Sequence, residues 1–167
     1  MGAAAACAAA AALAAACSSS TTTSGTETFA GTSTTLAQTP TIPLTASGVV
    51  SDHGSITLTG SGNGAGTGVI KLSKGNINVN HSAGKMSVSV DTASCTITQT
   101  ITGTYTVTGG TGTYDKATGS GSYKVTFAGT FAKSGGKCNV SADESPNAVP
   151  ASANTSFRAS GPLTTTS

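Results

Sequence analysis

The stretch that decides the fold of this chain is GGTGTYDKATG, residues 109–119. It lies between residues 95–108 and residues 122–131, two segments in which apolar or small residues mostly alternate with polar ones. A period of two predicts β-strands, because successive side chains of a strand point to opposite faces. Gly109 and Gly110 favour the positive φ angles of a tight turn. The stretch therefore predicts a turn that joins two long antiparallel strands.

Two functional interpretations of these glycines fail on spacing and context. A phosphate-binding loop ends in Gly-Lys-Ser/Thr and precedes a helix, and neither feature is present here. A calcium-binding β-roll repeats Gly-Gly-x-Gly-x-Asp, whereas here Asp115 stands one position late and the segment occurs once. In the structural interpretation, Tyr114 and Ala117 pack inward between the strands. Its turn glycines are Gly109, Gly110, Gly112 and Gly119.

The pattern of this segment resembles the GGTG-x-[FY]-x-x-A-x-G signature of the allene oxide cyclase and dirigent-protein barrels. The match covers roughly residues 105–123. The resemblance implies that the turn joins two strands of an antiparallel barrel of about eight strands. It also implies an enzyme, or a chaperone of a cyclisation or coupling reaction, that works in a hydrophobic barrel cavity. The cavity carboxylates and Arg of those families have no counterpart here, so no catalytic residue is carried over.

The rest of the chain also consists of short strand patterns bounded by Gly, Asn or Asp. Phe29 and Phe157 mark the first and last strand candidates, and no segment after the Ala-rich start has the helical period of 3.6. The predicted fold is thus all-β, an antiparallel barrel of about eight strands. One face of the two best strands would fill its interior or line a cavity. These residues are Ile97, Ile101, Tyr105, Tyr123, Val125, Phe127 and Phe131.

The N-terminal region is predicted to direct export. Residues 1–16 are almost all Ala, which is typical of a signal-peptide-like leader that is too short to span a bilayer. Small residues before Cys17 resemble a bacterial lipobox, in which this Cys is lipidated, as in envelope lipoproteins of high-GC Gram-positive bacteria. Residues 17–25 form a Ser/Thr-rich spacer and residues 26–167 the barrel domain. Since no Lys or Arg precedes the Ala run, an Ala-rich tail without a targeting role is the alternative.

If the leader with Cys7 is removed and Cys17 is lipidated, Cys95 and Cys138 remain. Two cysteines in an exported domain predict one disulfide. No metal site or cofactor is predicted, because no Cys-x-x-C occurs and neither His53 nor His81 has ligand spacing to a cysteine.

Composition excludes some classes of partner. Only 8% of the residues are charged and the net charge is +2, whereas ordinary domains have about 25% charged residues. The eight Lys and Arg are spread along the chain without interleaved aromatics, which argues against a nucleic-acid partner. Because Val, Ile and Thr recur with strand spacing, the sequence predicts an ordered β domain with neutral polar faces rather than disorder.

Candidate chemistry is sparse. His53 beside Asp52 suggests a general base, but adjacent strand residues face opposite sides, and a turn before Gly54 is the favoured interpretation. No G-x-S-x-G elbow is present. Arg158 follows Phe157 and is expected on the surface, with a place inside the barrel mouth as the alternative. The row of Thr residues at alternate positions from 96 to 108 suggests ice binding or, more simply, a neutral outer face.

The sequence leaves three functional hypotheses. The first is a non-catalytic, exported and lipid-anchored barrel that binds a small apolar ligand or is a structural module of the cell envelope; a small barrel can hold one ligand. The second is an allene oxide cyclase-like or dirigent-like enzyme. A buried carboxylate or His in a cavity would favour the enzyme, whereas a barrel filled by apolar side chains would favour the structural module. The third, a subunit of a homo-oligomer, is left open.

Overall fold

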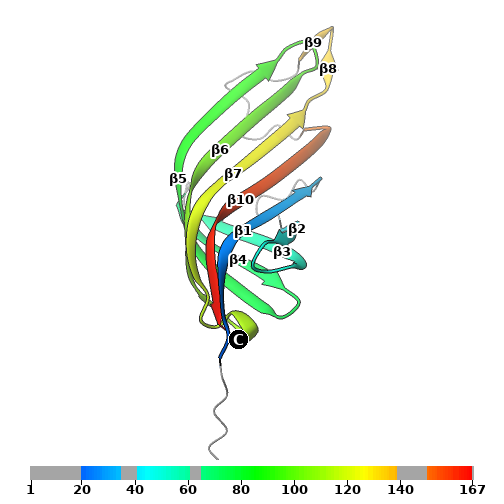
Figure 1. The fold of residues 1–167 in the computed structure, drawn as a ribbon. Helices are drawn as coiled ribbons and strands as arrows, with labels where there is room; N and C mark the ends of the chain where they lie inside the picture. The colour runs from blue at the N-terminus through cyan, green and yellow to red at the C-terminus, as the bar shows by residue number, and fades with distance from the viewer. Residues whose placement is uncertain (1–19, 35–40, 61–64, 139–149, 167) are drawn as a thin grey trace, which may run out of the picture.

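The computed structural model describes residues 20–34, 41–60, 65–138 and 150–166. The strands are β1 (Thr22–Ser33), β2 (Thr41–Ser47), β3 (Asp52–Gly60), β4 (Gly66–Leu72), β5 (Gly75–Asp91), β6 (Thr96–Gly110), β7 (Thr118–Thr130), β8 (Lys133–Ser134), β9 (Lys137–Cys138) and β10 (Ser152–Thr166). Eight of them close into an antiparallel barrel in the order β1-β10-β7-β6-β5-β4-β3-β2, and β8 pairs with β9 (Figure 1). This confirms the predicted fold class.

The predicted N-terminal boundaries lie partly outside the described residues, as do the leader (residues 1–16) and Cys17. Within the described part, β1 already begins at Thr22, inside the range predicted as spacer. Thr22 pairs with Thr166 and Ser24 with Thr164, and hydroxyl–hydroxyl hydrogen bonds join both pairs. β-Branched Thr has a high strand propensity, which explains why a segment with a linker-like composition continues the sheet. None of the described segments is a helix long and apolar enough to cross a membrane.

The strands of the barrel differ in length, and this asymmetry shapes the molecule. β2 and β4 have 7 residues each, whereas β5 has 17 and β6 and β10 have 15 each. The long strands therefore continue past the barrel as an open, curved sheet (Figure 1). We call this sheet the extension. It consists of residues 85–91 of β5, 96–102 of β6, 124–130 of β7 and 152–158 of β10.

The extension begins at a β-bulge. The register between β5 and β6 shifts between Ala83 and Lys85, so that Gly84 is the extra residue. The extra residue lies on β5, directly after the pair of Ala83 with Gly103 of β6. A bulge of one residue reverses the facing of every later side chain in the strand. Consequently Met86, which pairs with Ile101, continues the barrel's inner face.

The predicted turn closes the lower end of the barrel. It contains a short 3₁₀ turn, η1 (Gly112–Tyr114), and Gly109 and Gly112 have φ angles of 120° and 61°. The backbone of this turn rests on the β4–β5 turn, because Thr111 and Thr113 donate their N–H groups to Asn76 and Lys74. Tyr114 and Ala117 are buried, 3% and 1% exposed, as predicted. The glycine segment therefore closes this end of the barrel by packing and backbone hydrogen bonds and does not form a ligand-binding loop.

Asp52 connects three turns at this closed end. Its Oδ2 accepts hydrogen bonds from the Ser73 N–H at 3.0 Å and the Ser73 hydroxyl at 2.8 Å, and a longer one from the Tyr114 hydroxyl at 3.5 Å. The bond from the Ser73 hydroxyl, followed by those from the backbone N–H groups of His53 and Ser73, lowers the pKa of Asp52. The carboxylate thus joins the start of β3, the β4–β5 turn and the cap.

The predicted disulfide joins Cys95 and Cys138. Cys95 lies at the β5–β6 turn and is 2% exposed, and Cys138 ends β9. The Lys133 ammonium donates a hydrogen bond to the Ala93 carbonyl at 2.6 Å, beside the disulfide. Together these links hold the β8–β9 hairpin against the tip of the extension.

Candidate functional site

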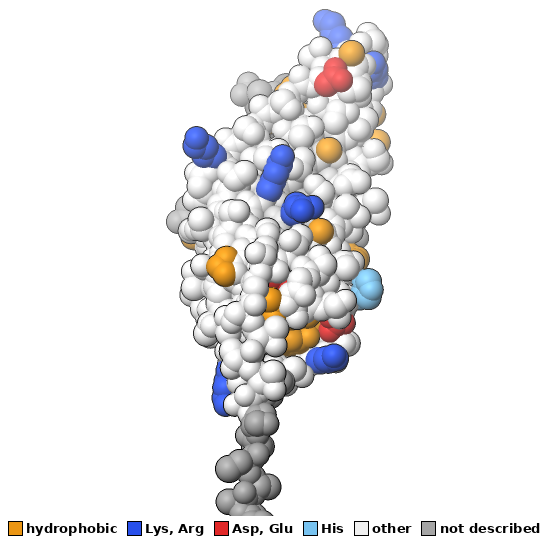
Figure 2. Space-filling model, viewed as in Figure 1, with side chains coloured by type: hydrophobic (Ala, Val, Ile, Leu, Met, Phe, Trp, Pro, Cys, Tyr) orange, Lys and Arg blue, Asp and Glu red, His pale blue; other side chains and the backbone are white. Residues whose placement is uncertain are grey.

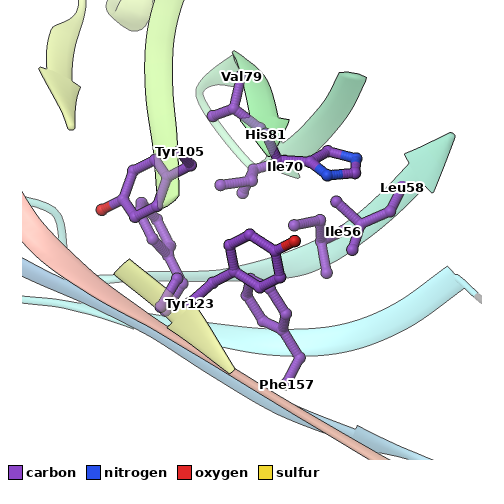
Figure 3. A pocket seen from close by; sticks show the side chains of 10 residues that line it. Ile56, Leu58, Ile70, Val79, His81, Tyr105, Tyr123 and Phe157 are labelled. Atoms are coloured by element: carbon purple, nitrogen blue, oxygen red, sulfur yellow. The ribbon is translucent and has the colours of Figure 1, made fainter. Parts of the chain in front are cut away.

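The candidate site is a small cavity lined by side chains of the barrel strands (Figure 3). It lies at the barrel mouth, because its lining residue His81 is the last residue of β5 that pairs with β4. Its volume is about 20 Å³, enough for roughly one water molecule. Below it the barrel is filled by apolar side chains. The walls are apolar apart from the polar atoms of one His and two Tyr. The principal lining residues are Phe29, Ile56, Ile70, Tyr105, Tyr123 and Phe157, with Leu58 and His81 beside them.

Two tyrosines lie opposite glycines across the β6–β7 pair. Tyr105 pairs with Gly121, and Tyr123 with Gly103. A Cβ atom on Gly121 would lie 2.7 Å from the ring of Tyr105, and one on Gly103 would lie 2.7 Å from the ring of Tyr123. Each glycine therefore leaves room for the opposite ring and also for a backbone carbonyl of the other neighbouring strand, that of Ser160 beside Gly121 and that of Ser82 beside Gly103. Burial raises the pKa of both hydroxyls, so they are neutral hydrogen-bonding groups at the cavity.

His81 brings the imidazole to this cavity. It is half-buried, and its ring packs edge-on against Tyr123 with the centroids 5.8 Å apart and the planes at 84°. Its Nε2 lies 3.3 Å from the Thr59 carbonyl oxygen. The sequence pointed to His53, beside Asp52, as the candidate general base. The sequence did contain a signal that His81 faces the barrel interior, because it continues the alternation of Ile77 and Val79, which face inward.

His53 does not reach the cavity. It is exposed, its Nδ1 lies 3.3 Å from the Thr45 hydroxyl, and its backbone N–H donates to Asp52. Asp52 is occupied by Ser73 and Tyr114, so the two neighbours do not form an acid–base pair.

The predicted cavity residues follow one continuous inner face, which the structure divides between the mouth and the extension. Tyr105 and Tyr123 line the cavity. Ile101 and Val125 pack on the core from above. The other three are half-buried near or on the extension: Ile97, Phe127 and Phe131.

Glu27 is a buried carboxyl that sequence reasoning missed. It is 0% exposed and shares the inner face of β1 with Phe29. Its Oε2 accepts a hydrogen bond from the Val50 N–H at 2.7 Å, and among the described residues Oε1 has no hydrogen-bond partner. Burial raises its pKa, while nearby backbone N–H groups, Val50 first, oppose that shift. The alternation of Glu27 with Phe29 was the available signal. The bond from Val50 joins Glu27 to the β2–β3 turn, and Glu27 is not among the residues that line the cavity.

The outer face of the long strands is polar and mostly uncharged (Figure 2). Arg158 is exposed there, opposite Lys124 in the register, and not inside the mouth. The Thr row of β6 also lies outward, and its hydroxyls bond to neighbouring strands, as between Thr104 and Ser82 at 3.0 Å. In the part of the chain that the structure describes, no group of His, Cys, Asp or Glu is arranged to hold a metal ion.

Comparison with known proteins adds no relative: the chain matches no family model, and neither curated proteins nor solved structures give a match.

Proposed function

We propose that the protein is a non-catalytic, exported barrel that binds a small apolar ligand at its mouth. It would be anchored through a lipid on Cys17 at the extracytoplasmic face of a bacterial membrane or in the cell envelope. The observation that carries the ligand proposal is the aromatic and aliphatic cavity around Tyr105, Tyr123 and Phe157, which continues onto the half-buried inner face of the extension. Binding sites for small molecules are mostly apolar, with a few polar groups that fix orientation.

The ligand would lie mainly on the extension, because the cavity alone holds about one water molecule. Ile101, Val125 and Phe127 form a half-buried surface above the mouth. One end of the ligand would enter between Tyr123 and His81, whose side chains meet edge-on at the rim. Covering such side chains yields about 25 cal/mol per Å² of apolar area.

The disulfide is compatible with the extracytoplasmic location, since disulfides persist in oxidising compartments. Anchoring is tested by the mass of the mature protein produced in a bacterial host with lipoprotein processing. The proposal expects loss of residues 1–16, acyl chains on Cys17, and no acylation in Cys17→Ala. An unmodified chain that retains residues 1–16 would contradict it.

Ligand binding is tested with the fluorescent apolar probe 1-anilinonaphthalene-8-sulfonate and with a series of fatty acids as competitors. We expect saturable binding that Phe127→Ser weakens about tenfold, because this change removes an inner-face ring. Thr126→Ala is the matched control, since Thr126 lies on the outer face of the same strand. Equal binding by both variants, or no saturation, would refute the proposal.

A second candidate is the allene oxide cyclase-like or dirigent-like enzyme, favoured by one observation: an imidazole lines the cavity beside two buried phenols. Mass spectrometry of compounds recovered after incubation separates the two. An unchanged ligand supports the binding module, whereas a product whose formation is lost in His81→Gln supports the enzyme.

A further inference from the structure

The free edge of the extension carries the most exposed large apolar side chains in the described chain. Met86, Val88 and Val90 are 65%, 57% and 59% exposed. All three belong to β5, and their alternate spacing places them on one face, where Gln99 donates a hydrogen bond to the Met86 sulfur at 2.9 Å. Elsewhere the described surface is mainly Ser and Thr, so this concentration on one strand is unusual for the chain.

Within the described residues, the backbone of this segment pairs on one side only. β4 pairs with β5 from Gly75 to His81, while residues 85–91 pair with β6 on the other side. Among the described residues no strand lies along the second edge of residues 85–91. Natural edge strands are usually protected by Lys, Pro or bulges. Here the bulge and Lys85 stand at one end and Asp91 at the other, and none of these lies between Met86 and Val90.

We propose that a second copy of this chain pairs antiparallel with this edge, about a two-fold axis at Val88. Val88 then faces Val88 of the second copy, and Met86 faces Val90 of the second copy. The same register places Lys85 opposite Asp91 of the second copy, once on each side of the axis. Positions 85 and 91 share the outer face, so the two charges meet on the same side of the joined sheet.

Neighbouring registers lose these matches. A two-fold axis at Ser87 would put Val90 opposite Gly84, and an axis at Ser89 would put Met86 opposite Thr92. Neither aligns Lys85 with Asp91. The axis at Val88 is the one of the three that pairs every apolar side chain and both charges. It makes a continuous sheet β10-β7-β6-β5-β5-β6-β7-β10 with the two barrels at opposite ends.

The paired segment has only seven residues in each copy, residues 85–91. Contacts of this kind are small beside the roughly 1,600 Å² of a standard stable interface. We therefore expect a weak dimer that dissociates on dilution and with added salt.

Cysteine cross-linking in the full chain tests the register, with Cys7 and Cys17 replaced by Ser in every variant. Directly opposite residues have Cα atoms about 4.5 or 5.5 Å apart, within the range of a disulfide. We expect Val88→Cys to give a covalent dimer under mild oxidation. Met86→Cys alone should not, because its two copies would lie about 14 Å apart along the strand. A mixture of Met86→Cys and Val90→Cys should cross-link. A monomeric Val88→Cys, or equal cross-linking by all variants, would overturn the proposal.

Sedimentation tests the charge pairing without introducing cysteine. Lys85→Asp places two carboxylates opposite each other and should weaken dimerisation about tenfold. Lys71→Asp, an exposed site on β4, is the control for the change in net charge. Adding Asp91→Asn to Lys85→Asp should restore part of the association, and Asn preserves the side-chain oxygen that accepts the Ala93 N–H at 2.8 Å. Equal association of Lys85→Asp and Lys71→Asp would overturn the register.

Discussion

Removing the Cys95–Cys138 disulfide should destabilise the whole barrel and not only its tip. The two cysteines are 43 positions apart, and the closed loop contains β6 and β7. Both strands belong to the barrel, so the loop can gain its full conformational freedom only when the barrel opens. For a loop of about 44 residues, the chain-entropy relation gives about 4 kcal/mol of stabilisation.

The perturbation is Cys95→Ala with Cys138→Ala, again in a background without Cys7 and Cys17. With a slope of about 2 kcal/mol per M, 4 kcal/mol corresponds to a urea midpoint lower by about 2 M. The chain has three Tyr and no Trp, so tyrosine fluorescence and circular dichroism are the probes. Equal midpoints for the oxidised protein and the double variant would refute the reasoning, because the extension would then open independently of the barrel.

A matched variant separates the cross-link from local strain. Cys95 has a φ of 55°, in the left-handed region that costs a non-glycine residue about 1 kcal/mol. Cys95→Gly with Cys138→Ala also lacks the disulfide but accommodates this backbone. It should be more stable than the double Ala variant by about 1 kcal/mol and less stable than the oxidised protein. Reduced wild-type protein should match the double Ala variant.

Three further changes test the core and the closed end by urea unfolding. Glu27→Gln should become more stable relative to wild type as pH rises. The raised pKa means that Glu27 keeps its proton in the folded protein at pH values where the unfolded chain has lost it. The free energy of unfolding of the wild type therefore falls as pH rises from the unfolded pKa to the folded pKa, and that of Glu27→Gln does not. A constant difference across pH would contradict this. Asp52→Asn should be less stable than wild type at neutral pH, and the gap should close as pH falls through the lowered pKa of folded Asp52; a gap that persists in acid would assign the loss to packing. Gly103→Ala should cost about 1–3 kcal/mol, because its Cβ would clash with the Ser82 backbone carbonyl oxygen and would also lie 2.7 Å from the ring of Tyr123. Since the backbone contact remains when the ring is removed, Gly103→Ala should also destabilise the Tyr123→Ala variant; no loss in that variant would show that the ring alone occupies the space.

The fold class follows from sequence because strand alternation and turn chemistry are local signals. The GGTG turn and the inward Tyr114 were predictable in this way. The Cys95–Cys138 pair was predicted differently, as the two cysteines that remain in an exported domain. The bulge was harder to predict, since Gly84 has no side chain that would indicate which face of the sheet it belongs to. The bulge can be recognised in the sequence by a change in which positions face inward. Ile77 and Val79, before the bulge, are at odd positions, whereas Met86, after it, is at an even position. Such a reversal within one strand requires an extra residue.

The candidate site was harder to predict because it depends on which strands close the barrel and where the closure stops. The sequence grouped Ile97 and Phe127 with Tyr105 and Tyr123, since all share one face of β6 and β7. Only the short β2, β3 and β4 determine that the tyrosines are enclosed while the other two lie above the mouth. His81 enters the site for the same reason, since it is the last residue of β5 that pairs with β4.

This difference in strand length divides one continuous sheet into two parts with different physical demands. Where β2, β3 and β4 close the barrel, inward side chains such as Phe29 and Ile56 are 1% exposed and supply packing energy. Above that level, the inner face has the same alternation, but no described strand lies opposite it, and Val88 is 57% exposed. A sequence selected only for stability would make these upper positions polar, because exposed apolar side chains on a free edge promote association. Because these apolar side chains lie beside the bulge and between Lys85 and Asp91, we propose that the extension carries the interaction surface and that the barrel supports it.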